Sequence, residues 1–227
     1  MAEMMKSASF KEDMGLDAVT DGWVKGAFFA AYALGQVPAG YLAVRFGARS
    51  LMSLYILLWS AFTVATGFAG GVVTLLLARI GCGFAEAGAY PISSGLLARW
   101  SEWNKRGFTS SIVSLGGRVG GAVAPWLTVV VIAGFGDWRW AGWLYGAVGI
   151  FFALFFWKVF REHPNEHPGT NEAERNLLAA GRPVEKLGEG DRTYRFPWRI
   201  ALTNRSLWMN CLTQFFTNLG WVFLAMW

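Results

Sequence analysis

The segment VVTLLLARIGCGFAEAGAYPISSGLLA, residues 72–98, decides the fold of this chain. It is uncharged apart from Arg79 and Glu86 and mostly apolar, and it is longer than the roughly 20 helical residues that cross about 30 Å of hydrocarbon. The whole chain is 54% hydrophobic and 15% charged, with a mean hydropathy of +0.35. That composition excludes an ordinary soluble domain, and the segment predicts a transmembrane helix.

Comparable apolar segments occur throughout the sequence. They cover residues 24–43, 51–68, 108–135, 138–160 and 207–227. The sequence therefore predicts an all-α polytopic membrane protein with six transmembrane helices. The 28 glycines, 13 tryptophans and 18 phenylalanines fit such a bundle, because glycine allows close helix contact and aromatic residues gather at membrane interfaces.

The basic residues of the connecting segments predict the orientation. Segments 44–50, 99–107 and 158–206 contain fourteen Lys and Arg residues, whereas the segments at the opposite helix ends contain three. The basic segments are therefore expected in the cytoplasm. This distribution also explains the net charge of +5 without a nucleic-acid partner.

This orientation divides the chain into four parts. Residues 1–23 are predicted to form an external loop without the apolar core of a signal peptide, and 24–160 five transmembrane helices. Residues 161–206 are predicted to be a cytoplasmic linker with a short helix at 171–178, and 207–227 a further transmembrane helix. Because the first helix would enter from outside and the last has no polar flank, we expect further helices before and after the sequence.

Three ionisable side chains lie inside the predicted helices: Arg79, Glu86 and Arg118. Each would cost about 3 kcal/mol if it faced lipid, so we expect all three to face a protein interior or a wet cavity. Arg79 and Glu86 lie roughly 10 Å apart along the axis and on nearly the same helix face. A guanidinium suits a substrate carboxylate, and a carboxylate in low dielectric can exchange a proton. The alternative is an ion pair that only fastens helices together.

Further polar residues could take part in this pathway. Tyr32 and Gln36 lie one turn apart and could bind a ligand or simply join two helices, and the residues alone leave both possibilities open. Arg118 lies within GGRVGG, residues 116–121, whose spacing favours tight helix packing. No strand precedes this stretch and no Lys-Ser or Lys-Thr pair follows, so it is not a phosphate-binding loop.

The remaining reactive residues predict no metal site, cofactor or enzyme activity. His163 and His167 flank Pro164 in the linker, where a solvated loop is a better interpretation than a metal site. Cys82 and Cys211 lie in apolar segments and are expected to be reduced packing residues. No nucleophile and base pair or metal-ligand set lies inside the predicted helices.

Two motifs resemble a known transporter family. GYLAVRFGAR, residues 40–49, resembles the major facilitator superfamily loop motif G-x-L-a-D-R-x-G-x-R. Within that superfamily, residues 76–91 resemble helix four of the anion:cation symporter family. REHP, residues 161–164, and the following EHP and NEAE resemble the segment after helix six. One departure is Val44, which replaces the motif aspartate and removes a charge interaction that helps to close the cytoplasmic side in relatives.

The resemblance implies helices two to seven of a twelve-helix fold, with helix one and most of the second half as missing partners. It implies a multi-pass protein of the inner or plasma membrane that carries sugar acids such as galactonate, glucarate or hexuronates, with a proton or sodium as coupling ion. Several residue roles follow from the same resemblance. Arg79, Tyr32 and Arg118 would contact the substrate, Glu86 would couple protons, and the cytoplasmic gating motif would comprise Gly40, Arg45, Gly47 and Arg49.

These observations favour proton-coupled symport of a small organic anion by alternating access, with Arg79, Tyr32, Gln36 and Arg118 as binding candidates. The alternative is a non-transporting fragment or a half-transporter that binds a partner. A membrane-embedded enzyme is the third hypothesis, and the absence of a catalytic set argues against it.

Overall fold

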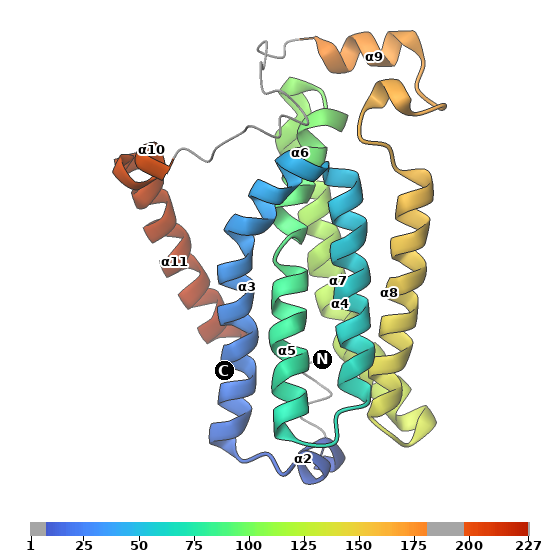
Figure 1. The fold of residues 1–227 in the computed structure, drawn as a ribbon, viewed down its shortest axis with the longest axis vertical. Coiled ribbons are helices and arrows are strands. Elements are labelled where there is room, and N and C mark those ends of the chain that lie inside the picture. Colours follow the sequence, from blue (N-terminus) through green and yellow to red (C-terminus); the bar gives the residue numbers. More distant parts are fainter. Residues whose placement is uncertain (1–7, 181–197, 227) are drawn as a thin grey trace. The chain divides into compact units, whose positions relative to one another are not determined.

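In a computed structural model, residues 8–180 and 198–226 are described, and they form helices without strands (Figure 1). The short elements are α2 (Ala8–Met14), η1 (Trp103–Lys105), η2 (Pro164–Glu166), α9 (Glu172–Ala179) and α10 (Trp198–Thr203). The long elements are α3 (Ala18–Phe46), α4 (Ala48–Gly67), α5 (Val72–Glu86), α6 (Ala89–Trp100), α7 (Arg106–Phe135), α8 (Arg139–Val159) and α11 (Arg205–Met226).

The structure confirms a helical, multi-pass membrane protein. Within the described residues, five stretches are long and apolar enough to cross a membrane, and they correspond to the first five predicted helices. The sixth predicted segment forms α11, which is not among these five. The chain divides into two compact units, Met1–Arg192 and Thr193–Trp227.

The first transmembrane helix begins earlier than predicted. Asp17 caps α3, since its carboxylate accepts a hydrogen bond of 2.7 Å from the Thr20 N–H. Asp21 then lies in the first turn, where a carboxylate interacts favourably with the helix dipole. Part of the segment predicted as an external loop is therefore helical, because these acidic residues stabilise a helix start.

The third predicted helix is two helices, α5 and α6, interrupted at Ala87 and Gly88 (Figure 1). Pro91 lacks an N–H and cannot bond the carbonyl of Ala87, which explains the interruption. Both intervening residues keep right-handed helical backbone angles, so the chain continues in nearly the same direction. Glu86 is thus the last residue of α5.

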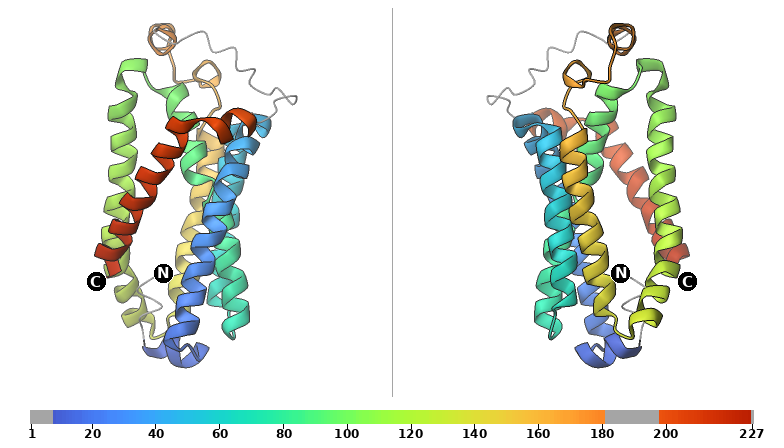
Figure 2. Two further views of the ribbon diagram at one scale, coloured as in Figure 1. Left: turned by 90° about the vertical axis from the view of Figure 1, so that its left-hand side faces the viewer. Right: turned by 90° about the vertical axis from the view of Figure 1, so that its right-hand side faces the viewer.

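Glycines allow the helices of the first unit to pack closely. α4 packs against both α5 and α8, and α3 packs against α5 (Figures 1 and 2). A Cβ at Gly146 of α8 would overlap Val64 and lie 2.8 Å from the carbonyl oxygen of Ser60, both on α4. Large side chains are therefore excluded from this interface, as in other membrane helix pairs.

The short helix α2 covers the end of the first unit that lies opposite α9 (Figure 1). Phe10 is fully buried against Trp138, with ring centroids 4.6 Å apart in an edge-on arrangement. Asp13 accepts hydrogen bonds from the Trp138 indole at 3.1 Å and the Arg139 guanidinium at 2.8 Å. These two bonds, the indole's first, lower the pKa of Asp13. α2 therefore joins the turn before α8 to the rest of the unit.

The linker segment up to residue 180 packs on the opposite end of the first unit. Its predicted short helix is confirmed as α9, which Asn171 caps by accepting a hydrogen bond of 2.8 Å from the Glu174 N–H. The Trp100 indole donates a hydrogen bond of 3.2 Å to the carbonyl of Arg161. In the second unit, α10 lies where the linker was predicted, and the Trp208 indole donates to the Leu202 carbonyl at 2.9 Å.

Candidate functional site

Helix α5 places Arg79 in the interior of the first unit. Its side chain is 7% exposed, and its Nε and Nη2 atoms have no hydrogen-bond partner among the described residues. Cys82, one turn further along α5, lies 3.9 Å from the Thr63 hydroxyl of α4 and interacts electrostatically with Arg79. A buried guanidinium without partners is costly, so these N–H groups are suited to an anionic or polar ligand.

Glu86 lies at the end of α5, two turns from Arg79. The carboxylate is partly buried and interacts electrostatically with Arg79. The described residues contain no ion pair with an N···O distance of 4.0 Å or less between these two side chains. A direct salt bridge between Arg79 and Glu86 is therefore not formed within the described part of the chain.

Tyr32 and Gln36 on α3 are both partly buried, and their side chains hydrogen-bond to each other. Tyr32 also interacts electrostatically with Glu86 and with Tyr90 of α6. Tyr32 and Gln36 therefore lie on the helix that packs against α5, which carries Arg79 and Glu86. Tyr90, which was not predicted as a site residue, is 66% exposed.

Arg118 lies on a different helix from Arg79 and Glu86. It lies on α7, whose main contacts are with α6, η1 and α8. Its side chain is exposed, and a Cβ at any of the neighbouring glycines at 116, 117, 120 and 121 would meet no described residue within 4 Å. The tight packing predicted for this stretch is therefore not formed within the described residues.

The cytoplasmic motif forms the turn from α3 to α4. Gly47 ends α3 with a φ of 85°, in the left-handed region that favours glycine. The Glu162 carboxylate, beyond the end of α8, accepts hydrogen bonds from the N–H groups of Ala48 at 2.9 Å and Arg49 at 2.7 Å. It also forms an ion pair with Arg99 at the end of α6.

Glu162 was missed in the sequence because it lies more than a hundred residues from the motif. Burial alone would raise its pKa, but the hydrogen bonds from Arg49, Ala48 and Arg99 outweigh burial and the pKa is lowered. The other motif residues have simpler surroundings. Arg45 is exposed, Arg49 stacks on the Trp157 ring at 4.6 Å, and a Cβ at Gly40 would lie in ordinary contact with Pro91.

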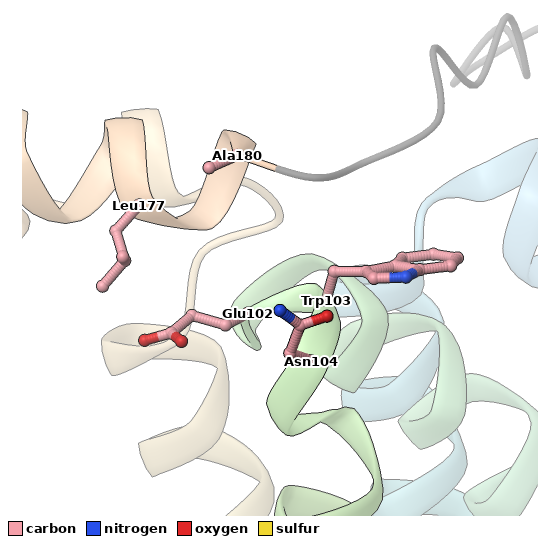
Figure 3. Close-up of a pocket in the computed structure, with 5 residues that line it drawn as sticks. All are labelled: Glu102, Trp103, Asn104, Leu177 and Ala180. Atoms are coloured by element: carbon pink, nitrogen blue, oxygen red, sulfur yellow. The ribbon is translucent and has the colours of Figure 1, made fainter.

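A pocket lies elsewhere, between η1 and α9 (Figure 3). Its volume is about 180 Å³, and it is lined by Glu102, Trp103, Asn104, Leu177 and Ala180. None of the predicted site residues lines it, so we do not assign it to the substrate. The nearby His167 is partly buried rather than solvated, with its ring edge-on to Trp100 at 5.6 Å and its Nδ1 accepting the Gly169 N–H.

Comparison with known proteins identifies related transporters. The family model of the Major Facilitator Superfamily matches residues 3–227. A probable sulfoacetate transporter of Cupriavidus necator is 31% identical over 95% of this chain and 49% of its own length. A probable galactarate/D-glucarate transporter of Escherichia coli is 33% identical over 83% of this chain and 43% of its own length. The chain thus spans about half the length of these relatives.

A solved structure supports the same fold. The crystal structure of a bacterial homologue of the human lysosomal transporter Spinster, in an inward-facing and unoccupied conformation, matches with a TM-score of 0.58. The two proteins are 23% identical, and the match covers 76% of this chain and 43% of that chain. At this identity the likeness supports the fold and nothing finer.

Proposed function

Because this chain belongs to the Major Facilitator Superfamily, we propose that it forms the first half of a transporter that carries a small organic anion across the inner or plasma membrane together with a proton. The relatives named as sulfoacetate, galactarate/D-glucarate and L-galactonate transporters motivate the substrate class. All of these compounds are small acids, and galactonate and glucarate are also rich in hydroxyl groups. A sugar acid is accordingly the proposed substrate.

The observation that carries this proposal is the buried Arg79 with unpartnered Nε and Nη2 atoms. These two atoms lie on the same side of a guanidinium and can donate two parallel hydrogen bonds to one carboxylate or sulfonate group. Substrate binding would satisfy donors that are otherwise buried without partners. Because these hydrogen bonds form between a cation and an anionic group, the binding free energy should favour anions over neutral sugars.

Glu86 is proposed to couple transport to protons. A partly buried carboxylate near Arg79 changes the local charge when it gains or loses a proton, and so changes the affinity for an anion. Tyr32 and Gln36 supply hydrogen-bonding groups beside it that suit a hydroxylated acid. Alternating access would require a second helix bundle that closes over the side chains of Arg79, Glu86 and Tyr32. The chain covers only about half the length of its relatives.

The test is uptake by the full-length protein reconstituted in proteoliposomes. We expect glucarate, galactonate or sulfoacetate to accumulate when the external solution is more acidic than the interior, and a protonophore to abolish this accumulation. Glucose serves as the neutral control and should not be taken up. Uptake of none of these acids would contradict the substrate class, whereas uptake that no pH gradient can drive would contradict proton coupling alone.

A further inference from the structure

Two glycines bring α3 and α5 into backbone contact beside the proposed proton-coupling residue, Glu86. On α5, a Cβ at Gly83 would overlap the carbonyl oxygen of Phe28 and lie 3.1 Å from the backbone nitrogen of Tyr32. On α3, a Cβ at Gly35 would lie 2.7 Å from the Cβ of Ala87. A separation below 3.0 Å is not tolerated between such atoms, so a methyl group at either position forces the two helices apart.

The contact lies directly beside the residue assigned to coupling. Gly35 precedes Gln36 and lies three residues after Tyr32, while Ala87 follows Glu86. Glu86 is partly buried at the end of α5, which packs against α3, and its charged neighbour is Arg79 on its own helix. Because access to water governs how readily a carboxylate gains or loses a proton, the separation of the two helices affects proton exchange at Glu86.

We infer that Gly35 and Gly83 are positioning residues for Glu86, holding α3 close against α5 and so keeping the carboxylate partly withdrawn from water. This inference rests on the proposed role of Glu86. Each acts by letting the backbone of one helix approach the other more closely than any side chain would allow.

A compensating substitution can distinguish a positioning role from a general loss of stability. In the Gly35→Ala variant the new methyl group meets the methyl group of Ala87, and its other close neighbour is the ring of Phe84, at 3.2 Å, which can rotate. The double variant Gly35→Ala/Ala87→Gly moves one methyl group across the interface and keeps the total volume. It should restore the original helix separation. Gly83 offers no such repair because the nearest neighbour of its new methyl group would be the carbonyl oxygen of Phe28, a backbone atom that no substitution removes.

Two control variants isolate the effect of position. Gly146→Ala introduces an equally severe clash, but between α8 and α4 and away from Glu86. It should lower stability without altering proton coupling. Gly26→Ala makes the same chemical change on α3 itself, at a site where a Cβ meets no described residue within 4 Å. It should alter neither property.

The experiment measures the pH at half-maximal sugar-acid uptake by the full-length protein in proteoliposomes, together with its thermal midpoint in detergent. Gly35→Ala should shift the pH midpoint by at least about half a unit, and the double variant should return it to the parent value. A thermal midpoint lowered in Gly35→Ala and Gly146→Ala alike, with the pH midpoint unchanged in both, would overturn the inference. If uptake by the parent protein did not depend on pH, that result would contradict the proposed proton coupling, and this inference with it.

Discussion

Glu162 and Arg99 form an ion pair that joins the segment after α8 to the end of α6. The same carboxylate accepts the first N–H groups of α4, from Ala48 and Arg49, which a helix start otherwise leaves unpaired. One side chain therefore fastens three helices at the end of the first unit that is expected in the cytoplasm. Such contacts can keep the ends of the helices together when a bundle moves as a rigid body.

Replacing Glu162 with glutamine should destabilise the first unit. An amide can accept only one of the two backbone hydrogen bonds and loses the ion pair with Arg99, so we expect a loss of about 1–3 kcal/mol. The thermal midpoint of the detergent-solubilised protein should fall by several degrees. Glu174→Gln, at an exposed position on α9, is the matched control and should leave the midpoint unchanged. Equal midpoints for both variants would show that the cluster does not stabilise the fold.

The lowered pKa of Glu162 predicts a pH dependence of stability. A carboxyl group whose pKa is lower in the folded state stabilises that state above its unfolded pKa, and the contribution is lost as the pH falls through the folded value. The difference in thermal midpoint between the parent and Glu162→Gln should therefore be constant from pH 7 to pH 5 and should shrink only below the ordinary value of 4.5. A difference that already shrinks between pH 7 and pH 5 would mean that the pKa is raised.

Asp13 should hold α2 in place on the opposite end. Asp13→Asn weakens the hydrogen bonds to the Trp138 indole and the Arg139 guanidinium, both of which are stronger with a charged acceptor. We expect faster hydrogen exchange of the α2 amides, measured by mass spectrometry on the intact protein. Lys11→Gln changes an exposed charge on the same helix and serves as control. Unaltered exchange in Asp13→Asn would mean that Phe10 and Met14 alone hold the helix.

Arg79→Lys should reduce affinity for the acid rather than abolish the fold. The lysine ammonium retains the charge but loses the planar pair of donors, so we expect the KM for uptake to rise about tenfold or more. Arg199→Lys makes the same substitution at an exposed position on α10 and should leave KM unchanged. A lowered thermal midpoint with an unchanged KM in Arg79→Lys would indicate a purely structural arginine.

The sequence predicted what depends on local composition. Five apolar segments, the buried charge of Arg79 and the helix at α9 follow from residue patterns within a few turns, and the structure contains all of them. The start of α3 was predicted too late because the acidic residues before it were assigned to a loop. Aspartate is in fact favoured at helix N-termini. The interruption before α6 was missed because it follows from the absent N–H of Pro91, whereas the apolar composition of the segment indicates one continuous helix.

Contacts between distant segments could not be predicted. Val44 was interpreted as the loss of a charge interaction at the turn from α3 to α4, and the Glu162 carboxylate reaches this turn from more than a hundred residues away. The packing of α3 against α5, which brings the helix of Tyr32 and Gln36 to the helix of Arg79 and Glu86, could likewise not be predicted from either helix alone. Periodicity gives the face of one helix but not the identity of the helix opposite, so such clusters require the three-dimensional arrangement.

The most direct test of the account is the effect of Glu86→Gln on two modes of transport by the full-length protein. Glutamine keeps the size and hydrogen-bonding capacity of the side chain but cannot exchange a proton. We predict that uptake driven by a pH gradient is lost, while exchange of internal for external sugar acid at equal pH continues at a rate within a fewfold of the parent. Gradient-driven accumulation that is undiminished in Glu86→Gln would contradict the central claim that this carboxylate couples anion transport to protons.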